Sequence, residues 1–464
     1  MLFSGALWSG AGKLLSMASQ LLLTVVLARA LPPSEYGLFF VAISSIMILA
    51  SVGTVGMDQV IVRFAAPLAS AGARSAMRRL AIRCLTVVLA ATTAVCISLF
   101  LLLPWLLGVV INAPGLIEYQ LVVLAWLFSA TVQRFLAETF RGMHDIRMAT
   151  LLGGVRNNGI SNAVGATLVI TVLWFSGLLS LETALLSMLL VSVAIVFAGF
   201  VALRRRLREL PDDVGGEGEQ VPHALLPVGG LVREGWPLWT AIMIAALYTQ
   251  SGAWLVSAFD SDDGVALFGV AQRLALVLIA PALVINAVLP PVVATLHASG
   301  NMPKLERTVR SLAGLSLLPC AALVVVLLIC GKTLLGQLFG DFYSSAFTLL
   351  MVLCVGQLIN VAAGAWQIVL PMTGRRHFML GTVLAALFAQ ATASVALGSY
   401  LGVLGVAIGF SVGQLVGNLV GVVLVRRSLG IWIFASVDVA VIKEAVTMIR
   451  ARLGRGRAKL AEGV

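Results

Sequence analysis

The stretch GVALFGVAQRLALVLIAPALVINAVLPPVVATLH, residues 264–297, is almost wholly apolar and carries a single charged side chain, Arg273. About 20 apolar residues in a helix are enough to cross the hydrocarbon core of a bilayer, so this stretch predicts a membrane span. Arg273 is expected ~14 Å from the outer end of that span, near mid-bilayer. A charge at this depth costs about 2.5–3.5 kcal/mol or more against lipid, so Arg273 should face a protein interior or a water-filled cavity.

The composition of the whole chain agrees with this interpretation. Of 464 residues, 60% are hydrophobic and only 11% are charged, whereas soluble domains have about 25% charged residues. The apolar runs are too long for the strands of an outer-membrane barrel, which alternate over about ten residues. An all-α polytopic membrane protein is therefore predicted.

About twelve transmembrane helices are expected, each near the length that crosses a bilayer. Their approximate ranges are 5–28, 36–58, 81–110, 117–140, 148–174, 178–203, 235–258, 264–295, 311–337, 344–371, 378–398 and 402–425.

The charges orient these spans. The formal net charge is +11, and most of the 31 basic residues lie in loops that follow even-numbered spans. The positive-inside rule explains this distribution better than a nucleic-acid partner does, and none is expected. Both termini are then cytoplasmic, in a multi-pass membrane protein.

Two halves of the chain are weakly similar. EYGLFFVA (residues 35–42) enters the second span, and GVALFGVA (residues 264–271) enters the eighth. Such spacing predicts two parallel-repeat six-helix lobes around a central cavity, with substrate bound between them. The expected organisation is an N-terminal lobe (1–203), a cytoplasmic linker (204–234), a C-terminal lobe (235–426) and an amphipathic, basic cytoplasmic tail (427–464).

Four basic residues fall inside expected spans: Lys13, Arg134, Arg156 and Arg273. Arg134 and Glu138 are i,i+4 partners, which favours a structural ion pair over a substrate contact. Lys13 either lines a cavity or extends its side chain towards the cytoplasm. Arg156 fits a cavity or a structural role equally well, whereas the depth of Arg273 favours a central cavity.

Polar residues recur at helical spacing on several spans. They include Gln20 in the first span, Gln357 and Asn360 in the tenth, and Gln414 and Asn418 in the twelfth. Such stripes line a wet interior or hydrogen-bond neighbouring helices, and the spacing fits both interpretations.

No enzyme is predicted. The four histidines are dispersed, the five cysteines lie in apolar runs without CxxC spacing, and there is no Walker A sequence. No catalytic set, metal site or cofactor is therefore expected.

Two stretches resemble a known family: GKLLSMASQLLLTVVLARALPPSEYGLFFVAISSIMILASVGTVGMDQVIVRFAA (residues 12–66) and LFGVAQRLALVLIAPALVINAVLPPVVATLHASG (residues 267–300). They are similar to polysaccharide repeat-unit flippases, including O-antigen translocases, of the multidrug/oligosaccharidyl-lipid/polysaccharide exporter (MOP) superfamily. The resemblance implies a V-shaped pair of lobes around a cationic cavity that moves undecaprenyl-diphosphate-linked oligosaccharides to the periplasmic leaflet. It implies that Arg273 and Lys13 supply basic residues of that cavity. Arg156 is the further candidate for the diphosphate site.

Other functions within the superfamily remain open. A lipid II flippase shares the substrate chemistry, and a multidrug/toxin exporter shares the architecture but would favour embedded carboxylates. The expected partners are the polyprenyl-diphosphate-linked oligosaccharide and membrane lipid, with glycan polymerase or export proteins as further candidates. Na⁺ or H⁺ is the candidate coupling ion.

Overall fold

The computed structural model describes residues 2–70, 73–153, 159–209, 227–375 and 377–436, and throughout these ranges the regular structure is helical. The chain divides into two compact units. The N-unit is Ala11–Gly269, and the C-unit comprises the described residues from Val270 onward with the first residues of the chain, up to Gly10.

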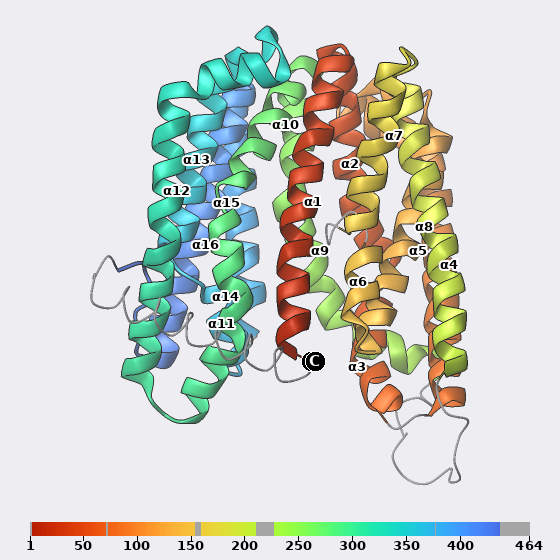
Figure 1. Cartoon of the computed structure of the whole chain (residues 1–464). Helices are drawn as coiled ribbons and strands as arrows, with labels where there is room; N and C mark the ends of the chain where they lie inside the picture. Colours follow the sequence, from red (N-terminus) through yellow and green to blue (C-terminus); the bar gives the residue numbers. More distant parts are fainter. Residues whose placement is uncertain (1, 71–72, 154–158, 210–226, 376, 437–464) are drawn as a thin grey trace, which may run out of the picture. The chain divides into compact units, whose positions relative to one another are not determined.

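The helices of the first part of the chain are shown in red to green in Figure 1. They are α1 (Leu2–Ala30), α2 (Pro33–Gly53), α3 (Met57–Ser70), α4 (Arg74–Trp105), α5 (Gln120–Gly142), α6 (Ile146–Leu152), α7 (Ile160–Phe175), α8 (Leu181–Glu209) and α9 (Val228–Phe259), with short turns η1 (Leu106–Val110) and η2 (Pro114–Leu116).

The second part runs from green to blue. Its helices are α10 (Asp262–Val277), α11 (Ala280–Ala298), α12 (Met302–Phe339), η4 (Asp341–Ala346), α13 (Phe347–Ala362), α14 (Trp366–Met372), α15 (His377–Leu401) and α16 (Val403–Leu429). The division between the units falls inside α10.

Among the described residues, ten helices are long and apolar enough to cross a membrane, and the bent pair α10 and α11 makes eleven. This confirms a polytopic all-α membrane protein. The expected span at 148–174 is not in that count, because α6 and α7 are short and residues 154–158 lie outside the described ranges. The other expected spans each correspond to an observed helix or helix pair.

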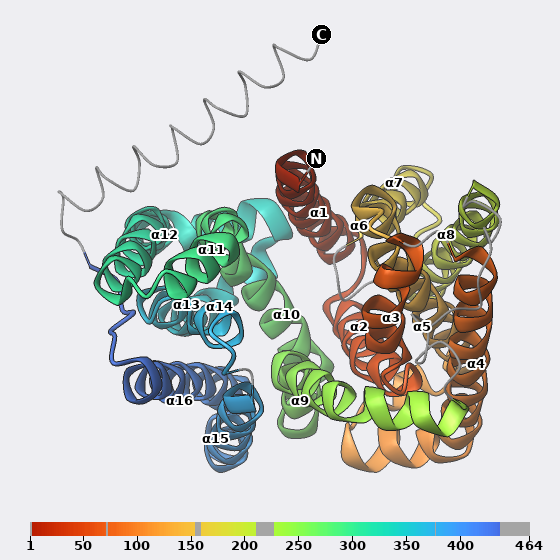
Figure 2. The same cartoon turned by 90° about the horizontal axis from the view of Figure 1, so that it is seen from below.

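Helix α5 lies at the centre of the N-unit and packs against α2, α3, α4, α6 and α8 (Figure 2). Its C-terminal half is buried on all sides, with Phe135 and Phe140 each 1% exposed. Helix α9 also packs in this unit, against α2, α3 and α4. The boundary between the compact units, at Gly269, therefore comes later in the chain than the expected linker at 204–234. The six-span repeat stays a prediction from the sequence.

In the C-unit, α15 and α16 run side by side (Figures 1 and 2). Helix α16 presents a glycine every four residues from Gly405 to Gly421. The facing side of α15 carries a matching stripe of buried residues. The stripe is Thr382, Ala386, Gln390, Ser394 and Gly398. Small residues at this spacing let two helix backbones approach closely.

The chain beyond α16 forms an extended C-terminal strap, residues 430–436. Side chains alternate along it: Ile431 and Ile433 are buried, whereas Trp432 and Phe434 are exposed. The main-chain N–H of Ala435 donates to the carbonyl of Ala362 (2.8 Å), at the end of α13. The strap is thus tied to the point where α13 ends. Residues 437–464, most of the expected amphipathic tail, lie outside the described ranges.

Candidate functional site

The structure describes two of the three cations expected at the diphosphate site, and these two lie on different helices. Arg273 lies in the last third of α10, near the middle of the bent span Asp262–Asn286, and is half-buried. It precedes the 47° bend between α10 and α11, where Pro281 lacks the N–H that would continue the helix. Lys13 lies on α1 and is exposed, and Arg156 lies outside the described residues.

Arg134 belongs to a buried cluster inside the N-unit. Its Nη2 pairs with Asp58 on α3, and its Nη1 donates to Ser51 Oγ on α2 (2.7 Å). Arg134 and Asp58 are 5% and 1% exposed. Glu138, the partner expected from helical spacing, accepts from Arg141 at 2.6 Å. Arg134 therefore has a carboxylate partner on another helix, and its structural role stays a prediction.

This cluster bridges a break in the chain between α2 and α3. Val55 and Gly56 there have φ of 45° and 77°, the left-handed region that favours glycine. The indole N–H of Trp239, on α9, donates to the carbonyl of Ser51 (2.8 Å). The charged contacts therefore join α2, α3 and α5, and Trp239 ties α9 to the same point.

Three of the polar stripe residues are buried in the C-unit. Gln357, Gln414 and Asn418 are 5%, 8% and 5% exposed. Asn418 Oδ1 accepts from the indole of Trp366 (2.8 Å), and its Nδ2 donates to the carbonyl of Gln414 (2.8 Å). The first bond joins α14 to α16, and the second lies within α16. None of the three residues lines the pocket described below.

The stripe in α1 is divided. Gln20 is half-buried, and Ser16 and Thr24 are buried, whereas Lys13 is exposed. The carbonyl of Ser19 accepts from Thr167 on α7 (2.9 Å). A main-chain contact beside this stripe therefore joins α1 to α7 in the N-unit.

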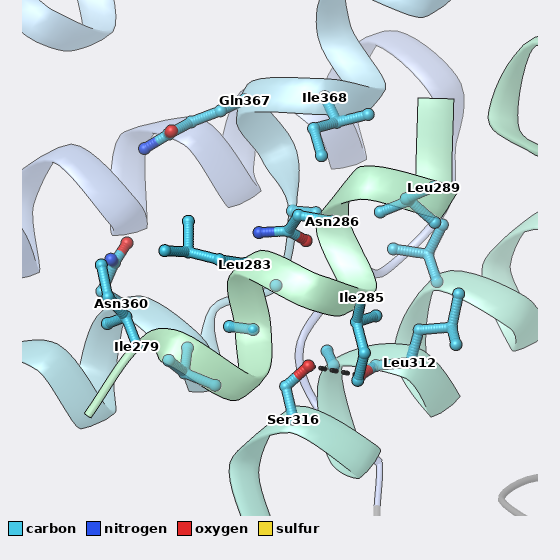
Figure 3. A pocket seen from close by; sticks show the side chains of 16 residues that line it. Ile279, Leu283, Ile285, Asn286, Leu289, Leu312, Ser316, Asn360, Gln367 and Ile368 are labelled. Atoms are coloured by element: carbon cyan, nitrogen blue, oxygen red, sulfur yellow. Dashed lines mark hydrogen bonds between the residues drawn. The ribbon is translucent and has the colours of Figure 1, made fainter. Parts of the chain in front are cut away.

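Asn360 lies in a different setting, a pocket of about 210 Å³ within the C-unit (Figure 3). α11, α12 and the junction of α13 and α14 form its walls, together with Ile279 just before α11. Its polar side chains are Asn286, Ser316, Asn360 and Gln367, and the remaining lining is apolar or small. Figure 3 shows Asn286 projecting from α11 into the space bounded by Asn360 and Gln367.

The helices around this pocket are interrupted, which leaves some main-chain carbonyls without their usual helical donors. Other parts of the C-unit donate hydrogen bonds to these carbonyls. The carbonyl of Leu278, at the α10–α11 bend, accepts from the Cys320 thiol of α12 (2.8 Å). The carbonyl of Ala362, before α14, accepts from the strap. Unpaired backbone groups cost several kcal/mol in a membrane, so these contacts stabilise the interruptions.

Sequence reasoning missed Asn286 and Ser316. Asn286 stands in the apolar stretch of the eighth span, with no polar neighbour at helical spacing. The available signal was the Pro290–Pro291 pair. Residue 290 lacks an N–H, so the carbonyl of residue 286 loses its usual helical donor.

Among the described residues, no group of three or more His, Cys, Asp or Glu is placed to hold a metal ion.

The fold is shared with solved membrane transporters. An inward-facing multidrug resistance MATE family transporter of the MOP superfamily matches with a TM-score of 0.70 and 17% identity, over 92% of this chain and 98% of its own. The lipid II flippase MurJ, in an inward closed conformation, matches with a TM-score of 0.63 and 10% identity, over 97% of this chain and 92% of its own.

A third match is a MOP superfamily transporter from Pyrococcus furiosus Vc1, described as having a binding pocket of reverse polarity that suggests a different function. Its TM-score is 0.62 at 16% identity, over 92% of this chain and 95% of its own. The chain thus has the fold of MOP superfamily transporters. No curated protein sequence matches it significantly.

The family follows from the sequence itself. Residues 2–297 match the model of the polysaccharide biosynthesis protein family, and the chain belongs to that family. The resemblance noted from residues 12–66 and 267–300 is thereby confirmed.

Proposed function

We propose that this protein moves undecaprenyl-diphosphate-linked oligosaccharides from the cytoplasmic to the periplasmic leaflet of a bacterial inner membrane by alternating access. The observation that carries the proposal is Arg273, a half-buried guanidinium near the middle of a bent membrane span in a polysaccharide biosynthesis protein. A guanidinium binds phosphate oxygens through two parallel hydrogen bonds. Arg273 therefore supplies the group that a lipid-linked diphosphate requires.

The balance of charge supports an anionic substrate. Arg134 and Asp58 neutralise one another in the interior of the N-unit. Lys13 and Arg273 are then the described basic residues of the expected diphosphate site, and Arg156 is the third member. The lipid carrier and its sugar enter the transporter together, and Na⁺ or H⁺ is the coupling ion. Both termini of the protein lie in the cytoplasm. Glycan polymerase or export proteins receive the product.

Deleting the gene is the direct test of this proposal. The expected result is accumulation of one lipid-linked oligosaccharide in the inner leaflet, identified by mass spectrometry of extracted lipids. Accumulation of lipid II would instead assign the function of a lipid II flippase. Increased drug sensitivity with unchanged lipid-linked glycans would assign a multidrug exporter.

Substitution of Arg273 tests the residue on which the proposal depends. In the deletion strain, Arg273→Ala is expected to lower flipping by about tenfold or more, because it removes a charge-assisted phosphate contact. Arg273→Lys should retain part of the activity, since it keeps the charge and loses the two-pronged geometry. The measurement is the steady-state level of accumulated lipid-linked glycan at matched expression.

The control for this experiment is Arg63→Ala. Arg63 is 62% exposed at its side chain and pairs with Glu234 at 2.9 Å, so its loss removes a surface ion pair. Such pairs contribute about 0–1 kcal/mol, and flipping should stay near wild type. Normal flipping by a stably expressed Arg273→Ala variant would refute the diphosphate role.

A further inference from the structure

We propose that the pocket formed by α11, α12 and the α13–α14 junction binds an uncharged sugar residue of the lipid-linked oligosaccharide. This proposal rests on the proposed function and assigns the sugar to a site distinct from Arg273, which is not among the pocket-lining residues. The lining residues all belong to the C-unit, so the site is complete within one compact unit.

The first argument is the chemistry of the lining. None of the described residues that line the pocket is charged. Three are amides, Asn286, Asn360 and Gln367, and each amide both donates and accepts hydrogen bonds. Sugar hydroxyl and acetamido groups require this mixture, whereas a diphosphate requires cationic partners.

Ser316 adds an oriented acceptor. Its hydroxyl donates to the carbonyl of Leu312 (2.9 Å, dashed in Figure 3), so its oxygen lone pairs face other partners. The carbonyl of Asn286 is a further acceptor, because Pro290 has no N–H to donate to it. The site thus offers acceptors for several hydroxyl groups.

The second argument is size and shape. The pocket has about 210 Å³ of space, far more than the roughly 10–15 Å³ that a single water needs. This is far more than a bare monovalent ion fills, and a single sugar ring is the kind of ligand that matches it. The apolar walls, which include Leu283, Leu312 and Ile368, suit the C–H faces of such a ring.

The third argument is that the pocket is held open by dedicated contacts. Gly364, at the α13–α14 junction, has φ of 81°, and a Cβ there would collide with the carbonyl of Ile433 in the strap. The strap also bonds α12, where the N–H of Ser436 donates to the carbonyl of Arg310 (3.1 Å). Polar sites beside interrupted helices are where many transporters bind substrate.

The test is protection of a cysteine placed in the pocket. Asn360→Cys is made in a background with the native cysteines replaced, using Cys320→Ser to keep a donor to the carbonyl of Leu278. Purified full-length protein is then modified with a small maleimide. Three probes are added separately: the oligosaccharide released by mild acid from the lipids of the deletion strain, inorganic pyrophosphate, and NaCl.

The released oligosaccharide is expected to slow modification about tenfold when present at ten times its Kd, because the free pocket falls to about a tenth. Pyrophosphate and Na⁺ should leave the rate unchanged. Protection by Na⁺ alone would make the pocket an ion site, and protection by pyrophosphate would make it part of the diphosphate site. Either result, or no protection by oligosaccharide, overturns the proposal.

A second measurement tests the same proposal without replacing the native cysteines, so it can be used if the cysteine-free protein does not fold. Asn360→Leu and Gln367→Leu in the natural sequence should abolish the rise in unfolding temperature that the released oligosaccharide produces in the wild type. Gln120→Leu is the control, since Gln120 donates to the carbonyl of Phe100 in the N-unit (2.7 Å). A temperature rise that survives both pocket substitutions would place the sugar elsewhere.

The two proposals fail in different ways. If deletion of the gene leaves lipid-linked oligosaccharides unchanged, the proposed function itself is wrong. If they accumulate, and Asn360→Leu and Gln367→Leu still restore normal flipping and normal oligosaccharide binding, only the sugar site is wrong.

Discussion

Replacing Arg134 with alanine is expected to lower the free energy of unfolding by about 3–5 kcal/mol, because it leaves the carboxylate of Asp58 buried without its partner. Asp58 is 1% exposed and accepts from Arg134 across two helices. The N–H···O bond from Arg134 to Ser51 is lost as well. The measurement is denaturant unfolding of the purified protein in detergent, with the unfolding temperature as a second observable.

Two further variants separate charge burial from packing. The double variant Arg134→Met with Asp58→Leu should recover most of the loss, since well-packed apolar residues often replace a buried ion pair without penalty. Arg63→Ala, which breaks the exposed pair with Glu234, should cost about 0–1 kcal/mol. Equal losses for Arg134→Ala and Arg63→Ala would contradict the buried-cluster interpretation.

Gly409→Leu is expected to destabilise the C-unit by about 3 kcal/mol, because overpacking at a close helix contact displaces backbone. A Cβ at Gly409 would lie 2.7 Å from the Cα of Ser394 on α15. Backbone atoms of α15 do not move aside as a flexible side chain does, so α15 and α16 must separate. Unfolding in detergent measures the effect, together with the yield of monodisperse protein.

Gly381→Leu provides the matched control. Gly381 belongs to α15, the same helix pair, but a Cβ there would meet nothing within 4 Å. The same change of glycine to leucine should therefore leave unfolding close to wild type or stabilise the helix slightly, since glycine is a poor helix former. A similar loss at both positions would mean that the α15–α16 contact is not the cause.

Much of the fold is predictable from the sequence because membrane spans depend on local composition. Apolar length determines the spans, and the four-residue repeat of glycines in α16 predicts a close helix contact. The partner helix was not predictable in the same way. Its stripe mixes Thr382, Ala386 and Gln390, and only the packed structure shows that these residues face the glycines.

The partner of Arg134 illustrates the same difficulty for charges. Glu138 is one helical turn away and was the natural choice, whereas Asp58 is 76 positions distant in sequence. Helical spacing identifies neighbours on one helix and carries no information about contacts between helices. The break at Val55 and Gly56 turns α3 so that Asp58 reaches α5, and this was not foreseen.

The candidate site was predictable only in part for a related reason. Asn360 and Gln357 lie three residues apart and fit one stripe, yet Asn360 lines the pocket and Gln357 is buried between helices. A polar stripe covers a wide enough part of the helix surface to contact both a cavity and a neighbouring helix. Spacing alone therefore does not show which of the two each residue of the stripe contacts. Asn286, isolated between apolar residues, was missed altogether.

The strap also constrains the order in which the protein matures. Ala362 receives its hydrogen bond from Ala435, a residue that the ribosome adds after α16. The wall of the pocket near Gly364 is therefore unfinished while the last helices enter the bilayer. Co-translational insertion can place every span, but this wall closes only once synthesis has passed Ser436, which makes its closure one of the latest steps in biogenesis.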